Sequence, residues 1–396
     1  MPWSPSSPMS LRLEFVAEAL TARSSFRALC ARYGISEKTG YKWRARFLAD
    51  GPDGLADRSH APHHCPHRIP AALEAQLLAE RKTHPTWGAR KLRAVLAAAA
   101  PGCAWPAAST LTAALGRAGV LAPRPRPAAR PVGHPAFLAG PPAAPNDVWS
   151  VDFKGEFRTG DGRYCYPLTV LDGASRMLLA CRARTRISGV ETRRTFERLF
   201  ASHGLPTAIR SDNGAPFATT AVRGLSVLSA WWVRLDIALQ RIRPGCPQEN
   251  GAHERMHRTL KAEATLPPRA TAAAQQRCFD AFRREYNDVR PHEALGQVAP
   301  ATRYSPSPRR YSARLPPLEY PPTFEERLIS RNGGFRWGGR AIFLTKALVG
   351  ERVGFDRIAD EQYAVYFGAL LLGHFTPRNG TMIDVARLPV SPIIPV

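Results

Sequence analysis

The stretch DVWSVDFKGEFRTGDGRYCYPLTVLDGASRMLLACRAR, residues 147–184, decides the fold. It holds three runs rich in aromatic and apolar residues, and the polar sequences RTGDGR and DGASR separate them. Runs of this kind with short turns between them predict three consecutive strands that pair as an antiparallel meander. Residues 189–204 then predict a helix that ends at Gly204, and residues 205–214 predict a short buried strand. A further strand near 236–244 completes an α/β layer fold.

The N-terminal segment predicts a helix-turn-helix. Residues 10–48 indicate three helices, with a turn at Gly34 and a cap at Ser36 before the last helix. The residues expected to face DNA from that helix are Lys38, Lys42, Arg44 and Arg46. The residues expected on its inner side are Leu29, Ile35, Trp43 and Phe47. A small helical bundle with a solvated basic face fits the same pattern.

The remaining modules follow from composition. We expect a helix-turn-helix domain at 1–58, a linker at 59–69 and a second helical, helix-turn-helix-like domain at 70–121. In this second domain Ser109 or Thr110 is expected to cap a helix, and Gly119 to end it. A Pro/Arg-rich linker at 122–145 precedes the core at 146–300. A linker at 301–322 and a small all-β, barrel-like module at 323–396 follow the core.

Charge indicates the partner. The 396 residues carry a formal net charge of +23, and most of the 55 basic residues are arginine. Such an excess favours a polyanion, first of all nucleic acid, although a compositional bias of the coding DNA also raises arginine. No apolar run of about 18 residues predicts a membrane span. Seven scattered cysteines predict no disulfide framework, so we expect a cytoplasmic, nucleoid-associated protein. The stretch HAPHHCPHR, 60–68, lacks the paired spacing of a zinc site.

Three acidic residues stand at unusual positions. Asp152 interrupts an apolar strand, and Asp212 ends one just before an Asn–Gly turn. Glu254 is the acidic residue of GAHERMHRTLK, 251–261, where His253, Arg255, His257, Arg258 and Lys261 are potential cations. If the three carboxylates converge, Mg²⁺ or Mn²⁺ would relieve their repulsion. Singly, each has an ordinary interpretation: an ion pair with Lys154, an Asx turn, or a helix ion pair with Arg258.

Five motifs carry a resemblance: WSVDFKG (149–155), YPLTVLDGASR (166–176), IRSDNGAPF (209–217), PQENGAHERMHRTLK (247–261) and YNDVRPHEALG (286–296). Together they resemble the DDE transposases of bacterial insertion sequences, which share the retroviral-integrase catalytic domain. The resemblance implies a ribonuclease-H-like fold in which Asp152, Asp212 and Glu254 are catalytic and bind two Mg²⁺ or Mn²⁺ ions. The gap between the second and third acids, 41 residues, is longer than usual in the family. We place the extra residues at 223–237, and Glu249 is the fallback for the third acid.

The resemblance also implies a function. A transposase of this kind binds the terminal repeats of its element, hydrolyses the DNA ends and joins the 3′-OH groups to double-stranded target DNA. It would act as a homodimer or larger synaptic complex, away from membranes. Arg258 and Lys261 would hold DNA phosphates on the helix face of Glu254. The alternatives are a non-catalytic helix-turn-helix regulator, a ribonuclease-H-like nuclease that only hydrolyses, and an inactive transposase copy.

Overall fold

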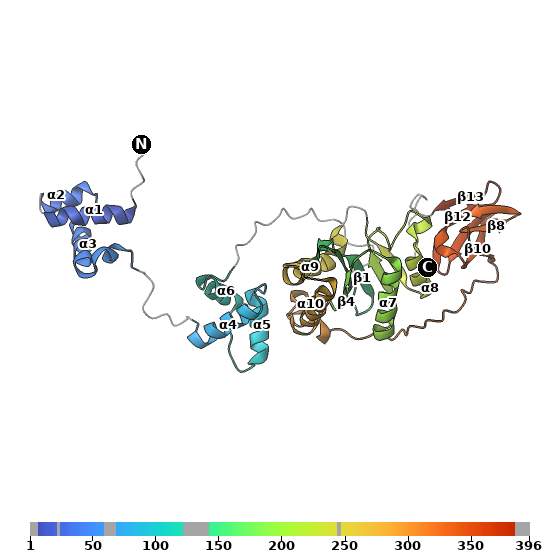
Figure 1. Cartoon of the computed structure of the whole chain (residues 1–396), viewed down its shortest axis with the longest axis horizontal. Coiled ribbons are helices and arrows are strands. Elements are labelled where there is room, and N and C mark those ends of the chain that lie inside the picture. The colour runs from blue at the N-terminus through green and yellow to red at the C-terminus, as the bar shows by residue number, and fades with distance from the viewer. Residues whose placement is uncertain (1–6, 22–23, 59–68, 122–141, 244–246, 385–396) are drawn as a thin grey trace. The chain divides into compact units, whose positions relative to one another are not determined.

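The structure is a computed structural model that describes residues 7–21, 24–58, 69–121, 142–243 and 247–384 (Figure 1). The chain divides into two compact units, Met1–Arg68 and Ile69–Val396. The histidine-rich stretch at 60–68 and most of the predicted linkers at 59–69 and 122–145 lie outside the described residues. Within the described ranges, none of the helices has the length and apolarity that a bilayer span requires.

The first unit is a three-helix domain. Its helices are α1 (Pro8–Thr21), α2 (Phe26–Arg32) and α3 (Glu37–Asp50). The Ser36 side chain accepts a hydrogen bond from the Thr39 amide, which confirms the predicted cap of α3. Gly34 turns the chain between α2 and α3 with a φ of 66°. Of the four predicted inner residues, Leu29 and Trp43 are buried, and Ile35 and Phe47 pack against them.

The second unit begins with three further helices, α4 (Ala71–Thr83), α5 (Ala89–Ala99) and α6 (Ala108–Arg117). The predicted cap of α6 is wrong. The helix begins one residue before Ser109 and two before Thr110, and Ala107 at its N-terminus supplies no capping side chain. Packing of the buried Leu111 and Leu115 stabilises α6 instead, because tertiary contacts contribute more to a short helix than its cap does.

The α/β core follows. Its strands are β1 (Val148–Phe153), β2 (Phe157–Arg158), β3 (Tyr164–Asp172), β4 (Leu178–Arg184), β5 (Ala208–Ser211) and β6 (Ala238–Arg241). Its helices are α7 (Gly189–His203), α8 (Val227–Arg234), α9 (Gly251–Leu260) and α10 (Ala272–Arg284). Strand β3 pairs antiparallel with β4 and β1, which confirms the predicted meander, and β1, β5 and β6 are parallel neighbours. The predicted α/β class is therefore confirmed.

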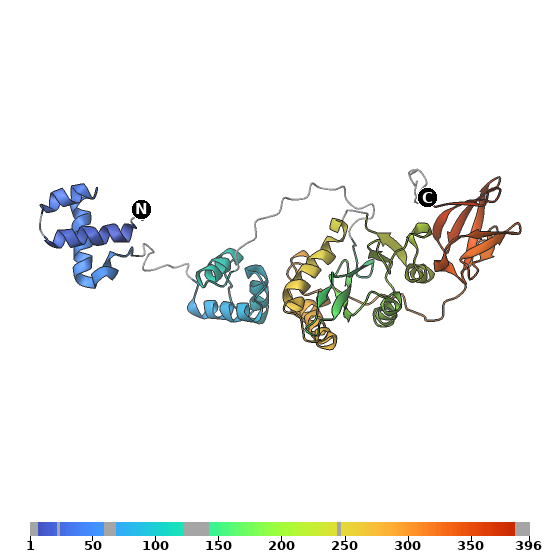
Figure 2. The same cartoon turned by 45° about the horizontal axis from the view of Figure 1, so that its top comes forward.

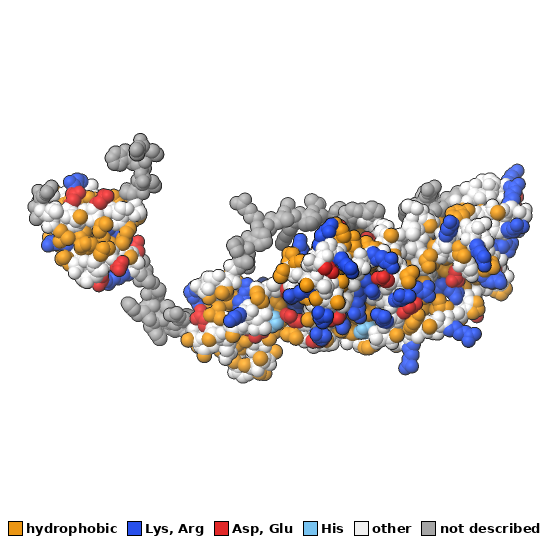
Figure 3. All heavy atoms as spheres, viewed as in Figure 1, with side chains coloured by type: hydrophobic (Ala, Val, Ile, Leu, Met, Phe, Trp, Pro, Cys, Tyr) orange, Lys and Arg blue, Asp and Glu red, His pale blue; other side chains and the backbone are white. Residues whose placement is uncertain are grey.

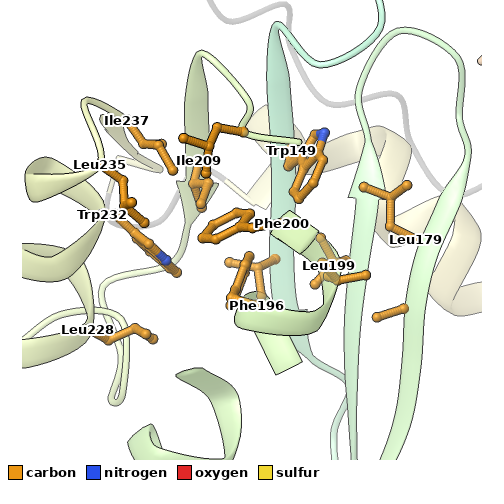
Figure 4. Packing of buried hydrophobic residues seen from close by; sticks show 14 of the residues in the cluster. Trp149, Leu179, Phe196, Leu199, Phe200, Ile209, Leu228, Trp232, Leu235 and Ile237 are labelled. Atoms are coloured by element: carbon orange, nitrogen blue, oxygen red, sulfur yellow. The ribbon is translucent and has the colours of Figure 1, made fainter. Parts of the chain in front are cut away.

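Helices cover both faces of this sheet (Figure 2). On one face, α7 and α8 pack against β1 through a cluster of large apolar side chains, and Phe200 lies between Trp149 and Trp232 (Figure 4). The ring centroids of Trp149 and Phe200 are 5.8 Å apart, and those of Phe196 and Trp232 are 5.0 Å apart. On the other face, Met256 of α9 and Phe279 of α10 are buried against β3 and β4. The sheet is thereby held between two layers of helices.

The C-terminal module is all β, as predicted. Its strands are β7 (Glu325–Leu328), β8 (Gly334–Trp337), β9 (Arg340–Phe343), β10 (Arg352–Ala359), β11 (Gln362–Phe367), β12 (Leu370–Thr376) and β13 (Thr381–Asp384). Five of them form one antiparallel sheet in the order β13-β12-β11-β10-β7, and β8 and β9 form a separate hairpin. The described strands thus make two sheets instead of one closed barrel. Phe335 of the hairpin packs on Phe355 and Phe375 of the larger sheet.

Segment 223–237 joins the core to this module. It contains α8, whose Trp231 and Trp232 are buried in the core. Ala230, also on α8, instead belongs to the apolar cluster of the C-terminal module. The Arg234 guanidinium forms an ion pair with Glu351 at 3.4 Å. The residues between the second and third candidate acids therefore build a contact with the β module.

Candidate active site

Two of the candidate acids lie on neighbouring parallel strands. Strands β1 and β5 pair in register, with Ser150 opposite Arg210. Continuing this register by two residues brings Asp152 level with Asp212, just beyond the end of β5. Neighbouring strands lie about 4.8 Å apart. The sheet therefore places these two carboxylates side by side at one edge.

The third acid comes from α9, which packs on the same face of the sheet. Side chains alternate along β1, so Trp149 and Val151 enter the apolar cluster under α7 while Ser150 and Asp152 face α9. Met256 and Leu260 bury the inner side of α9, which leaves Glu254 exposed beside the strand ends. The helix thus presents its carboxylate without burying it.

The charges of the other two acids act on Asp152, although the group of ligand atoms that lies within 4.8 Å joins Asp152 to His253 and His257 and not to Asp212 and Glu254. Burial, the charge of Asp212 and more weakly that of Glu254 raise the pKa of the Asp152 carboxyl to about 7. Lys154 and the backbone amide of Phe153 act in the opposite direction without offsetting this rise. Carboxylates that resist ionising together are suited to sharing a divalent cation, which would stabilise their charged forms.

The loop after β5 holds Asp212 in place. Its Oδ1 accepts a hydrogen bond from the Gly214 amide at 3.2 Å, which is the expected Asx turn. Asn213 donates to the Ile242 carbonyl oxygen at 2.8 Å. The guanidinium of Arg241 donates to the carbonyl oxygens of Asp212 and Phe217. The turn interpretation and the site interpretation of Asp212 are therefore compatible.

Two histidines of α9 behave differently from what the sequence indicates. His253 is wholly buried and His257 nearly so. Burial, with His257 as a neighbour, holds the pKa of His253 well below its usual value. Burial and Lys154 lower the pKa of His257 to about 3. Both are therefore neutral, and grouping them with the cations of this helix is wrong. Their spacing of four residues was the signal that they share one helix face.

Neutral His257 lies against Asp152, with 3.7 Å between Nδ1 and Oδ2. This contact is not an ion pair, because the imidazole carries no charge. One nitrogen of each histidine and one Asp152 oxygen lie within 4.8 Å of one another, so these three residues are also able to hold a metal ion. Sequence reasoning did not find this group.

The other ordinary interpretations of the acids do not hold. Among the described residues, no basic side chain forms an ion pair with Glu254, and Lys154 forms none with Asp152. The fallback Glu249 is already occupied, since its carboxylate accepts hydrogen bonds from the amide and guanidinium of Arg243. These bonds lower the pKa of Glu249, which suits a structural carboxylate.

Basic side chains are spread over the visible faces of the α/β core and the C-terminal module (Figure 3). Arg258 and Lys261 are exposed along the side of Glu254. A cavity of about 300 Å³ lies next to α9, and its lining includes Lys91, Arg176, Arg255 and Arg290. The sequence did not single out this cavity, because its cations come from α5, a β-turn, α9 and the segment after α10.

The four predicted DNA-binding residues of α3 differ in exposure. Lys38 and Lys42 are exposed, one helical turn apart. Arg44 and Arg46 are half-buried, and the Arg46 guanidinium lies 5.2 Å from the centroid of the Trp43 ring. The Lys42 ammonium also lies over this ring, 4.5 Å from its centroid, so Lys42 and Arg46 share a contact with Trp43.

Two family models match the core. Residues 142–247 match an integrase core domain, and residues 235–300 match a second model with the same description. Residues 11–63 match a helix-turn-helix domain, and residues 39–115 match a homeodomain-like domain. The integrase matches together include all three candidate acids.

Relatives come from insertion elements and retroviruses. The chain is 31% identical over 231 residues to the insertion element IS476 uncharacterized 39.2 kDa protein of Xanthomonas euvesicatoria, covering 58% of this chain and 64% of that protein. It is 32% identical over 161 residues to the insertion element IS407 uncharacterized 31.7 kDa protein of Burkholderia multivorans, covering 40% and 56%. It is 36% identical over 120 residues to the Gag-Pol polyprotein of avian reticuloendotheliosis virus, covering 30% and 10%. The chain thus spans less than two thirds of each relative's length.

Solved structures of integrases are also similar. The HTLV-2 integrase catalytic core domain in complex with magnesium covers 41% of this chain and 98% of its own, at 14% identity and a TM-score of 0.33. A simian T-cell lymphotropic virus intasome in complex with the PP2A regulatory subunit B56 gamma covers 75% and 97%, at 16% identity and a TM-score of 0.36. The chain thus matches an integrase core domain behind helix-turn-helix domains, and the relatives named above are proteins of insertion elements and retroviruses.

Proposed function

We propose that this protein is a DNA transposase. It would bind the terminal repeats of an insertion sequence, hydrolyse the phosphodiester at each end and join the freed 3′-OH to target DNA. The observation that carries the proposal is the register of β1 and β5, which brings Asp152 level with Asp212; the charges of Asp212 and Glu254 add to burial in raising the pKa of Asp152. Such a group of acids in an integrase core domain supports phosphoryl transfer better than it supports a purely structural role.

The three carboxylates fit a pair of divalent cations. Their oxygens are the ligands that Mg²⁺ and Mn²⁺ prefer, and their mutual repulsion would be relieved by positive charge. When bound there, such ions supply the charge that activates a water or 3′-OH and stabilises the leaving oxygen. Asp152 and Asp212 would orient the reacting phosphate from the sheet edge, and Glu254 would do so from α9.

DNA would be held by the basic surfaces. Lys38 and Lys42 on the outer face of α3 would enter the major groove, flanked by Arg44 and Arg46. Arg258 and Lys261 would contact phosphates beside the acids, because they are exposed on the same helix side. Binding should therefore weaken steeply with salt. Two DNA ends must meet, so we expect a homodimer or larger synaptic complex acting at the bacterial nucleoid.

Strand joining in vitro tests the proposal. The full chain is mixed with Mg²⁺ and oligonucleotides from its element's own ends, and joined products are measured for wild type, Asp212→Asn and Asp360→Asn. Asp360 is a matched control, since its side chain is 98% exposed in the C-terminal module. We expect Asp212→Asn to bind the ends but to join them about 100- to 1,000-fold more slowly, because groups that organise charge at the reacting centre contribute on this order. The control should join normally.

The same experiment separates the rival functions. A nuclease would release hydrolysed ends without joined products. A non-catalytic regulator would bind the ends and yield neither product. Equal joining by Asp212→Asn and wild type would refute the assignment of the carboxylates.

A further inference from the structure

A buried hydrogen-bond network connects α9 to the sheet directly behind Asp152. Its members, which we call the histidine cluster, are Ser150, Thr169, His253 and His257. The Thr169 hydroxyl has three polar neighbours: the Asp152 carbonyl oxygen at 3.1 Å, His253 Nε2 at 2.7 Å and His257 Nε2 at 2.7 Å. The contacts leave little freedom in where the hydrogens go.

A hydroxyl carries one hydrogen and two lone pairs. The Asp152 carbonyl oxygen only accepts, so all three contacts are satisfied when the Thr169 hydroxyl donates to it. Both Nε2 atoms must then donate to the hydroxyl oxygen. A neutral imidazole has its hydrogen on one nitrogen alone. In this arrangement the Nδ1 atom of His257 carries no hydrogen and keeps its lone pair.

The Nδ1 atoms of the two histidines have different surroundings. Nδ1 of His253 lies 2.8 Å from the Ser150 hydroxyl, which also lies 3.3 Å from the Leu171 carbonyl oxygen, and the whole His253 side chain is buried. Nδ1 of His257 has no hydrogen-bond donor among the described residues and faces Oδ2 of Asp152 at 3.7 Å. The His257 side chain keeps 10% of its surface exposed, and the Asp152 side chain beside it keeps 32%. His257 thus offers a nitrogen ligand where His253 does not.

The distance between Nδ1 of His257 and Oδ2 of Asp152 suits two ligands of the same cation. Two ligand atoms that each lie about 2.1–2.2 Å from one cation are about 3.0–3.8 Å apart when the angle between the bonds is 90–120°. The distance of 3.7 Å between Nδ1 and Oδ2 falls within that range, although it is too long for a hydrogen bond. We propose that Nδ1 of His257 is a further ligand of the divalent cation held at Asp152, so that this ion binds an imidazole nitrogen beside carboxylate oxygens.

This inference rests on the proposed function, since the cation is the one that the carboxylates would hold. It adds a consequence for metal preference. Mg²⁺ favours oxygen ligands, whereas a nitrogen ligand raises the relative affinity for Mn²⁺ and later transition metals. Thr169 and His253 are positioning residues in this arrangement, because they fix the tautomer of His257 without touching the ion.

Electron spin-echo spectroscopy of the Mn²⁺-loaded full-length chain tests the ligand directly. We expect coupling between Mn²⁺ and a histidine nitrogen in the wild type, with a pattern that changes when histidine is labelled with ¹⁵N. The coupling should vanish in His257→Gln and persist in His374→Gln, a control on β12 of the C-terminal module. Titration should show Mn²⁺ binding about tenfold weaker in His257→Gln, with a smaller change for Mg²⁺.

The outcomes separate the ligand from the function. A wild type that joins DNA but shows no nitrogen coupling, or one whose coupling survives in His257→Gln, overturns the ligand assignment and leaves the transposase proposal standing. A wild type that shows the coupling but joins no DNA overturns the transposase proposal and leaves the ligand assignment standing. Absence of nitrogen coupling in the wild type overturns the assignment whether or not the variant folds.

Discussion

Trp149 and Val151 of β1 point to one face of the central sheet, whereas Ser150 and Asp152 of the same strand point to the other. The first face is filled by aromatic rings from α7 and α8. The second face carries buried hydroxyls and imidazoles, each with a hydrogen-bond partner. One strand therefore serves both packing and chemistry, because its side chains alternate with a period of two. The aromatic face therefore contributes mainly to stability, and the face of Asp152 carries the polar groups of the candidate site.

The largest effect on stability should come from the aromatic face. Phe196 of α7 is fully buried, so Phe196→Ala should lower the free energy of unfolding by about 3–5 kcal/mol. Urea denaturation of the full chain measures this loss. Val190→Ala on the same helix is the control, since that side chain is 64% exposed and its change should be near zero. A loss under about 1 kcal/mol at Phe196 would contradict the role of this face.

A reciprocal pair of substitutions on β3 compares the two faces directly. Thr169→Val removes the hydroxyl that three groups contact, and should cost about 1–3 kcal/mol of unfolding free energy. Val170→Thr, one residue along, puts a hydroxyl into the apolar cluster and should cost a similar amount. Urea denaturation measures both. If either change proved neutral, the faces would differ less than their contacts indicate.

The smallest expected effect is the change in stability with pH that Asp152 causes in the metal-free protein. The pKa of Asp152 is raised from 3.8 to about 7, so between these values the folded chain binds more protons than the unfolded chain. This contribution to stability is present at low pH and is lost as pH rises. Asp152→Asn lacks the charged form, so its thermal midpoint in EDTA should equal that of the wild type near pH 4 and exceed it by a few degrees at pH 8. A constant difference across this pH range would show that the pKa of Asp152 is not raised in the folded chain.

The strands and the helices were predictable because their signals are local. Alternating apolar residues, the Asp–Asn–Gly turn and the Ser36 cap each act within a few positions of the chain. The start of α6 was not predictable in this way, since packing of Leu111 and Leu115 outweighs the capping signal at Ser109. The sequence also could not show that the Glu249 carboxylate accepts a hydrogen bond from the Arg243 guanidinium, because that contact depends on how the chain folds.

By itself, the sequence determined the α/β core, the helical and all-β modules on either side of it, and the three carboxylates that end strands or begin a helix. Only the tertiary structure decided that His253 and His257 are buried and neutral. Ser150 and Thr169, which hold these rings, lie 103 and 88 residues away along the chain. Protonation depends on the burial and neighbours that such distant contacts create, so no local pattern of residues reports it.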